Sequence, residues 1–225
     1  MAKGDARATG ARANPAKPGK AAGATGGAKA GYHHKNLRSA LIESGKQLLE
    51  SSGLPGFSLR MAARTAGVSQ TAPYHHFPDK DGLLAAMAAD GFQRLAGELE
   101  ALADGGVRPL MLAFLRFAKA NPQMFRLMFA TDPAARPPSG ELKVAFDRCW
   151  AACAAATRIQ LGETDETTPK ARQATLAIWS GMYGLARLLI DAIGPSSDLD
   201  DERAADAVVE IFQRGLAPQE RRATH

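Results

Sequence analysis

Residues 57–84 read FSLRMAARTAGVSQTAPYHHFPDKDGLL, and the capping and turn residues in this stretch decide the fold that we expect. Ser58 is a typical N-cap for a helix over 59–66, and Gly67 ends that helix in the left-handed conformation that glycine adopts at little cost. Ser69 then predicts the start of a further helix. Because the turn between them is so short, the two helices must meet at a steep angle, as in a helix-turn-helix.

The chain from about residue 35 onward has helical periodicity, without a convincing alternating strand pattern. A first helix ends at Ser51-Ser52-Gly53, and its apolar stripe consists of Leu37, Leu41, Ile42, Gly45, Leu48 and Leu49. Asp79 predicts the N-cap of a long helix from Lys80 to about Ala103. Further helices are expected at 107–120, 122–130, 139–161, 168–193 and 199–216, between breaks rich in proline and glycine.

These elements predict an all-α protein with an N-terminal three-helix domain joined by a long helix to a second helical domain. The segments that we expect are a basic tail at 1–31, the helix-turn-helix domain at 32–80, the second domain at 81–217 and a flexible C-terminus at 218–225. The tail is rich in alanine, glycine, lysine and proline and is expected to be disordered. Residues 1–30 hold six basic side chains and one acidic one, which equals the whole net charge of +5. The tail is either a solvated leader or an arm that adds non-specific attraction to an anionic polymer.

Composition predicts a soluble, cytoplasmic protein. No apolar run reaches the roughly 18 to 20 residues that a membrane helix needs, and the chain does not open with a secretory leader. The two cysteines, Cys149 and Cys153, are four residues apart on an expected helix and suit a reducing compartment. Their alanine-rich surroundings favour a role as small apolar core residues over a redox switch, which stays the alternative.

The helix that begins at Ser69 has the right residues to read DNA. A helix fits the major groove, and its first residues meet the base edges. Gln70 can pair with adenine, and Thr71 offers a hydroxyl and a methyl group to thymine. Free backbone N–H groups at the Ser69 end would lie near a phosphate, and the hydroxyl of Tyr74 could reach another.

At this point the chain resembles the tetracycline-repressor (TetR) family. The resemblance lies in the capped helix, the Ala-Gly-Val-Ser turn and the Tyr-x-His-Phe-x-x-Lys exit of the quoted stretch, and in the lead-in YHHKNLR at 32–38. Two further segments, FLRFAKANPQMFRLMF at 114–129 and WSGMYGLARL at 179–188, resemble the regulatory domain of a subgroup with a Trp-x-x-x-His-Gly signature. Tyr183 stands where that signature has histidine.

Helix geometry and the resemblance together imply a set of DNA contacts. The residues expected to face DNA are Arg60, Ser69, Gln70, Thr71, Tyr74, His75 and Lys80, with Lys80 on a phosphate. His76 and Phe77 are expected to pack inward and close the small domain.

The resemblance also implies a small-molecule cavity and a subunit interface in the second domain. Most of its apolar side chains are ordinary core, but the candidate ligand-binding residues are Phe114, Phe117, Phe125, Met128, Phe129, Trp150, Trp179, Tyr183 and Arg187. The last two expected helices carry small residues and an apolar stripe, namely Ala177, Gly181, Gly184, Ala204, Val208, Ile211 and Phe212. In the family such helices form a four-helix interface, so a homodimer is expected, with two recognition helices about 34 to 36 Å apart.

We therefore expect a transcriptional regulator, a homodimeric repressor that leaves a near-palindromic operator when it binds a small apolar or amphipathic ligand. The histidines lack further ligands at metal-binding spacing, and no phosphate loop, nucleophile elbow or carboxylate pair is found, so neither a metal, a cofactor nor an enzyme is expected. Two alternatives stay open. One is a helical enzyme or small-molecule carrier with a vestigial helix-turn-helix, and the other is a non-specific DNA-coating protein that uses the basic tail.

Overall fold

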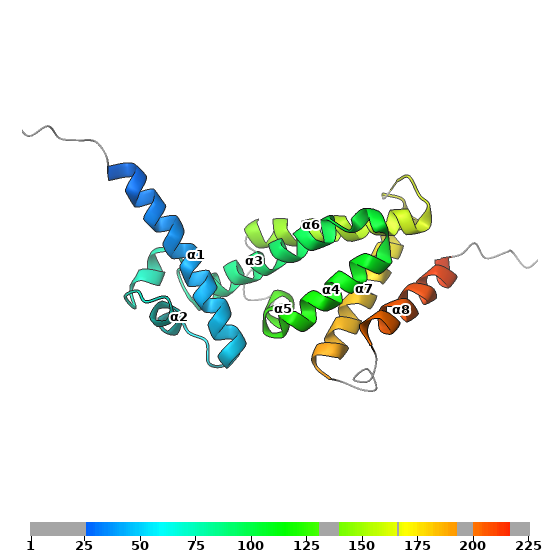
Figure 1. The fold of residues 1–225 in the computed structure, drawn as a ribbon. Coiled ribbons are helices and arrows are strands. Elements are labelled where there is room, and N and C mark those ends of the chain that lie inside the picture. Colours follow the sequence, from blue (N-terminus) through cyan, green and yellow to red (C-terminus); the bar gives the residue numbers. More distant parts are fainter. Residues whose placement is uncertain (1–25, 131–139, 166, 193–199, 217–225) are drawn as a thin grey trace, which may run out of the picture.

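The structure is a computed structural model that describes residues 26–130, 140–165, 167–192 and 200–216 (Figure 1). Every regular element in these ranges is helical, which confirms the predicted all-α class. The α-helices are α1 Gly26–Ser52, α2 Leu59–Thr65, α3 Lys80–Glu100, α4 Val107–Ala120, α5 Pro122–Phe129, α6 Gly140–Leu161, α7 Pro169–Ile190 and α8 Asp201–Leu216. Two short 3-10 helices, η1 Ala72–His75 and η2 Ala103–Gly105, lie between them.

Most helix boundaries agree with the prediction within a few residues, but α1 starts earlier. It begins at Gly26, so residues 26–31, which the sequence pattern places in the tail, lie in this helix. The rest of the predicted tail and the predicted C-terminus at 218–225 lie outside the described residues. None of the helices in the described ranges combines the length and the apolar character that crossing a membrane requires.

The small N-terminal domain follows from its caps. The hydroxyl of Ser58 accepts a hydrogen bond from the Met61 backbone N–H at 3.2 Å, and Gly67 adopts a φ of +69°, as predicted for the two ends of α2. The elements of this domain bury a common core made of Leu41, Leu49, Phe57, Leu59, Phe77 and Leu83.

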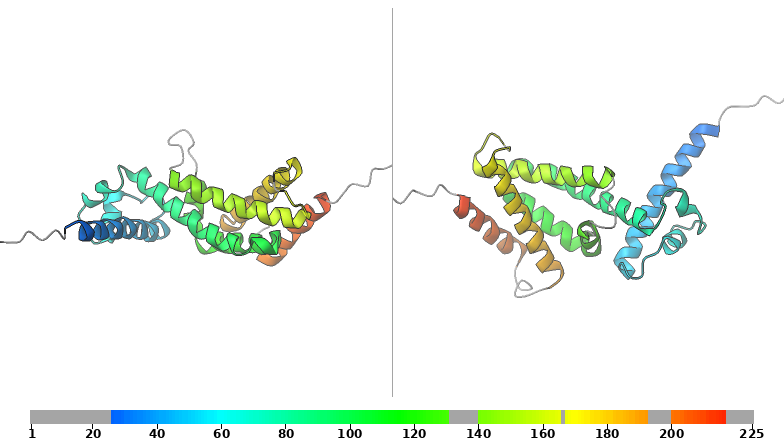
Figure 2. Two further views of the ribbon diagram at one scale, coloured as in Figure 1. Left: turned by 90° about the horizontal axis from the view of Figure 1, so that it is seen from above. Right: turned by 180° about the vertical axis from the view of Figure 1, so that it is seen from behind.

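The helix α3 belongs to both halves of the molecule. The carboxylate of Asp79 caps it by accepting from the Gly82 N–H at 2.7 Å, as predicted. Its 21 residues extend over about 30 Å, from the small domain into the larger one, where it lies alongside α6 (Figure 2).

The larger domain is built from α4 to α8 around the second half of α3. α4 packs on α7 and α8, and α6 packs on α3 and α7 (Figures 1 and 2). Two ion pairs at the surface connect α8 to α4. The Arg108 guanidinium lies 2.5 Å from a carboxylate oxygen of Asp206, and the Lys119 ammonium lies 2.9 Å from a carboxylate oxygen of Asp201. The hydrogen-bonded guanidinium of Arg108 lowers the pKa of Asp206 below its ordinary value.

Two glycines let neighbouring helices approach α3 closely. A Cβ atom at Gly45 of α1 would lie 2.7 Å from the sulfur of Met87 in α3. One turn further along α3, a Cβ atom at Gly91 would lie 2.7 Å from the sulfur of Met128 in α5. Since such distances are shorter than any van der Waals contact of carbon, a side chain at either position would require the facing methionine to move. The helices α1 and α5 are therefore held against adjacent turns of α3.

The Gly91 contact yields a stability prediction. Gly91→Val should lower the free energy of unfolding by about 1 to 3 kcal/mol, because the branched side chain overlaps Met128 and separates α5 from α3. Gly97→Ala is the control in the same helix: no atom beyond its chain neighbours and the local helix backbone lies within 4 Å of its Cβ position, so the free energy of unfolding should rise by about 0.5 to 1 kcal/mol. Urea unfolding measures both, and an equal effect of the two variants would contradict the close-packing argument.

Candidate DNA-binding site and aromatic core

The segment after α2 is not the α-helix that Ser69 predicts. Only the 3-10 helix η1, Ala72–His75, follows the turn, and the Ser69 hydroxyl lies 3.2 Å from the Thr71 hydroxyl and caps nothing. The reason is Pro73, which has no N–H to donate to the Ser69 carbonyl; that carbonyl accepts from Ala72 at 3.1 Å, in the i to i+3 pattern of a 3-10 turn. The prediction that Ser69 caps an α-helix is therefore wrong, and so is the prediction that the dipole of such a helix lies beside a phosphate.

The short turn still displays its polar side chains. Ser69, Gln70, Thr71 and His75 are exposed, and Tyr74 is 52% exposed. Arg60 is exposed near the start of α2. Tyr74 and Arg60 share a surface cavity of about 350 Å³ that is also lined by Ser58, Pro78, Asp79 and Lys80. Three of the residues predicted to contact DNA, Arg60, Tyr74 and Lys80, therefore line one cavity, and the other four are exposed in the turn before η1 and in η1 itself.

Phe77 anchors this surface to the domain beneath it. Its ring is buried, and its backbone N–H donates to the Pro73 carbonyl at 2.8 Å. The guanidinium of Arg38 in α1 stands 5.6 Å from the ring centroid. His76 is half-buried beside it, with 6.4 Å between the two ring centroids. Both side chains pack as predicted, so η1 is fixed from the inside while Tyr74 and His75 face outward.

The Lys80 ammonium, which is expected to contact a phosphate, already has partners within the protein. Its ammonium donates to the Leu54 carbonyl at 3.3 Å and lies 5.8 Å from the centroid of the Phe57 ring. The side chain thus supports the loop before α2. To contact a phosphate, it would have to leave the Leu54 carbonyl or share its protons between the two partners.

The larger domain contains a continuous cluster of aromatic rings. Neighbouring ring centroids lie 4.7 to 6.5 Å apart, with most pairs tilted or edge to face. The cluster, which we call the aromatic core, consists of Phe92, Phe114, Phe125, Phe129, Phe146, Trp150, Trp179 and Tyr183. It draws on α3, α4, α5, α6 and α7, so it joins five helices.

The aromatic core includes six of the nine predicted ligand-binding residues. The other three lie at its edge or outside it: Phe117 faces the guanidinium of Arg94 at 5.8 Å, Met128 packs on Gly91, and Arg187 pairs with Asp191 at 2.6 Å. Phe92 and Phe146 were not among the nine. Phe92 is the only aromatic residue between 80 and 103. Its isolated position on a long expected helix was the one sequence feature that could have indicated its place in the aromatic core.

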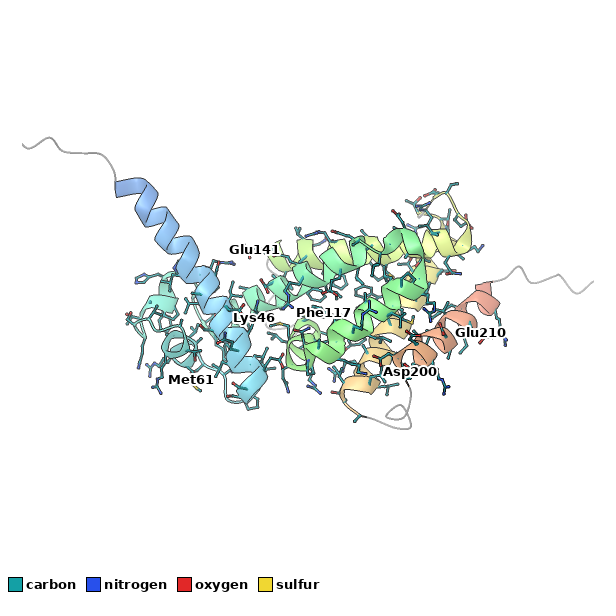
Figure 3. The ribbon with its side chains drawn as sticks, in the orientation of Figure 1. Lys46, Met61, Phe117, Glu141, Asp200 and Glu210 are labelled. Atoms are coloured by element: carbon teal, nitrogen blue, oxygen red, sulfur yellow. The ribbon has the colours of Figure 1, made fainter. Side chains whose placement is uncertain are left out.

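Cavities open at the junction of the two domains, away from the aromatic core. Two of them, of about 400 and 480 Å³, meet at the Arg38 and Glu141 side chains, which pair at 2.7 Å. Figure 3 shows Glu141 at the start of α6 and Lys46 on α1 near this junction. A third cavity, of about 550 Å³, lies between α1, α3 and the start of α5. In the aromatic core the rings touch one another, so a ligand there must displace them.

Cys149 and Cys153 are buried thiols in α6. The thiol of Cys149 donates to the Phe92 carbonyl, with 3.4 Å between sulfur and oxygen. Burial raises the pKa of each thiol to about 12. Neutral thiols in an apolar setting are poor nucleophiles, which favours the packing role over a redox switch. In the described part of the chain, no cluster of three or more histidine, cysteine or acidic side chains could hold a metal ion.

Comparison with known families identifies both domains. Residues 41–87 match the family described as "Bacterial regulatory proteins, tetR family", and residues 107–212 match "Tetracyclin repressor-like, C-terminal domain". The first match covers α2, η1 and parts of the flanking helices, and the second covers the aromatic core from α4 onward. The chain belongs to the TetR family of bacterial regulators. It is thus a DNA-binding transcriptional regulator with a helix-turn-helix domain and a ligand-binding C-terminal domain.

Solved structures share this fold. A protein of unknown function from Rhodococcus sp. RHA1 is 28% identical, with a TM-score of 0.69 over 83% of this chain and 98% of that one. A TetR family transcription regulator from Marinobacter aquaeolei VT8 is 17% identical, with a TM-score of 0.58 over 80% and 96%. The fatty acid degradation regulator FadR from Bacillus halodurans is 11% identical, with a TM-score of 0.61 over 78% and 94%. At the identities of the last two, the likeness shows the fold alone.

The buried thiols give a pH prediction. The pKa of each thiol is about 9 in an exposed setting and about 12 in the fold, so the thiols stay neutral in the native state. The free energy of unfolding should therefore fall as the pH rises from about 9 toward 12, where only the unfolded chain ionises.

Thiol labelling at pH 8 provides the direct measurement. Both cysteines should react with a thiol reagent only at the rate at which the domain opens, and fast labelling should require denaturant. Rapid labelling of the native protein, or a disulfide between the two cysteines in native protein, would contradict the packing role. Cys149→Ala is a suitable reference, since it leaves one thiol in the same helix.

Proposed function

We propose that this regulator is a homodimeric repressor that binds a near-palindromic operator and is released by a small apolar or amphipathic ligand. The observation that carries the proposal is the surface around η1, where polar and basic side chains stand outward over a buried Phe77. Such a surface can enter a groove without unfolding the domain. The protein would act in the cytoplasm, where its DNA is found.

On this proposal, the DNA contacts divide into two kinds. Gln70 and Thr71, on the turn before η1, would read bases in the major groove. Arg60, Ser69 and Tyr74 would hold phosphates, and the cavity between Arg60 and Tyr74 has the size to receive a phosphate oxygen. His75 is exposed at the end of η1 and would contact the adjacent backbone or base edge. Lys80 would join the phosphate contacts only by turning away from Leu54.

The aromatic core would be the ligand site. Rings and methionines make an adaptable apolar lining, while the Tyr183 hydroxyl and the Trp150 indole N–H can each offer a hydrogen bond. Tyr183 lies 4.7 Å from Phe129 and 6.2 Å from Phe125, measured between ring centroids. Occupancy would favour a subunit arrangement whose recognition segments are wrongly spaced for the operator. A ligand can shift this balance only through its preference for that arrangement.

The subunit interface would be the outer face of α7 and α8. Leu176, Leu188 and Ile211 are large apolar side chains that stand exposed there. Gly181 lets the two helices cross closely, since a Cβ atom at this position would lie 3.0 Å from the Phe212 ring. Two such helix pairs can bury one another across a two-fold axis, which presents two recognition segments to neighbouring turns of DNA.

Selection of bound DNA from a random pool tests the proposed operator, and point variants then test the contacts. Gln70→Ala should weaken binding to the selected operator by about 1 to 3 kcal/mol and relax the preference at one base pair. Arg60→Ala should weaken operator and random DNA alike and reduce the dependence on salt, because a phosphate contact is lost. Equal losses on both DNAs for Gln70→Ala would remove this residue from base readout. Recovery of an asymmetric site would contradict the two-fold repressor.

The interface is tested by placing a charge on it. Ile211→Glu should convert the dimer to a monomer in sedimentation experiments, because Ile211 is 69% exposed in the single chain but would be buried between subunits. Val144→Glu is the matched control: this side chain is 61% exposed on α6, outside the proposed interface. A dimer that survives Ile211→Glu but dissociates with Val144→Glu would place the interface on α6.

A further inference from the structure

The helix α5 of the ligand-binding domain is capped by a side chain from the DNA-binding domain. Glu50, near the end of α1, accepts a hydrogen bond from the Met124 backbone N–H, with 3.0 Å between the carboxylate oxygen and the nitrogen. Met124 is the third residue of α5, and the backbone N–H at this position is one that an N-cap side chain ordinarily accepts a hydrogen bond from. The two residues are 74 positions apart in the sequence.

The natural cap position of α5 is otherwise engaged. Asn121 precedes Pro122, but its amide donates to the Phe117 carbonyl at 3.0 Å, at the end of α4, and makes no cap hydrogen bond to α5. Pro122 has no N–H of its own. Glu50 therefore meets an open N–H group at the positive end of the α5 dipole, which a carboxylate stabilises more strongly than a neutral acceptor.

This cap closes a triangle of helices at the domain junction. α1 is held against α3 through Gly45 and Met87, and α5 is held against the next turn of α3 through Gly91 and Met128. Glu50 supplies the third side, from α1 directly to α5. Lys46 adds a bond within the triangle, since its ammonium reaches Asp90 of α3 at 2.8 Å and lies near this crossing (Figure 3).

The far side of α5 lies in the aromatic core. Phe125 and Phe129 are on this helix, and Phe125 directly follows the capped Met124. Phe125 contacts Phe114 of α4 at 5.4 Å, and Phe129 contacts Phe92 of α3 at 5.2 Å, between ring centroids. We expect a molecule that displaces these rings to push against α5, and a movement of α5 would change the geometry of the hydrogen bond at its first turn.

We propose that Glu50 is the positioning residue that transmits a displacement of α5 to the DNA-binding domain. This inference rests on the proposed function and adds the connection between its two sites. With the cap made, α1 and the recognition segment behind it keep one orientation relative to α5. With the cap broken, α1 keeps its packing on α3 and the Arg38–Glu141 ion pair to α6 but loses its hydrogen bond to α5. Linkage then requires that DNA binding, in turn, stabilises the capped α5.

Hydrogen exchange of the α5 amides tests the inference without a known ligand, with the selected operator as the probe. Exchange is measured in the peptide that covers 122–129, with and without saturating operator, for wild type, Glu50→Ala, Glu50→Gln and Gln47→Ala. Gln47 is the matched control because it is exposed one turn earlier on α1 and lines the same cavity between the domains. Glu50→Gln keeps an oxygen that can accept the hydrogen bond but removes the charge.

In the free protein, Glu50→Ala should speed exchange in the first turn of α5 roughly fivefold, and Gln47→Ala should leave it unchanged. Operator should slow this exchange at least about twofold in wild type and in Gln47→Ala, but not in Glu50→Ala. Glu50→Gln should retain part of the operator effect.

The possible failures separate the two proposals. If no specific operator is recovered, the proposed function fails and this inference fails with it. If operator binds but exchange in α5 does not respond in wild type, only the connection through α5 is overturned. If Glu50→Ala responds to operator as strongly as Gln47→Ala, the two domains communicate through other contacts and Glu50 is not the positioning residue.

Discussion

The close packing of α3 against two other helices is the constraint on which the rest of the structure depends. α1 approaches it at Gly45 and α5 approaches it at Gly91. At each glycine, a methionine sulfur occupies the space that a side chain larger than hydrogen would need. One rigid helix thereby receives the DNA-binding domain on one turn and the ligand-binding domain on the next. Because protein interiors are densely packed and transmit strain, we expect a change of position on one side of α3 to affect the other.

On the proposed function, the DNA-binding and ligand-binding sites lie at opposite ends of a short path. The exposed turn before η1 is fixed from beneath by Phe77, which touches Arg38 of α1. Near the C-terminal end of α1, Glu50 accepts a hydrogen bond from the first turn of α5, a helix whose rings form part of the aromatic core. The path thus consists of a few packed helices and one charged hydrogen bond, and it does not involve the buried thiols.

Local signals predicted most of the fold, and they failed where a local rule met a tertiary or covalent constraint. The caps Ser58 and Asp79 and the glycine at 67 were confirmed because each acts within a few residues of itself. Pro73 removed the donor that a helix beginning at Ser69 needs, so the recognition segment is a 3-10 turn. The bond from Met124 to Glu50 spans 74 positions, and no spacing in the sequence indicates a cap supplied from another domain. The aromatic residues were visible in the sequence, but which rings touch depended on how five helices meet.

The close contact at Gly45 has a consequence for genetics. On the proposed repressor function, a search for variants that no longer repress should return substitutions at this position beside those on the exposed turn, although Gly45 lies on the inner face of α1, against Met87. Both kinds of variant would have the same phenotype. Their proteins would differ, since a substitution on the exposed turn leaves the buried core unchanged, whereas one at Gly45 requires the Met87 side chain to move within the contact between α1 and α3. For the proposed homodimer, dominance over the wild-type allele would then depend on whether the altered chain still pairs with a normal subunit.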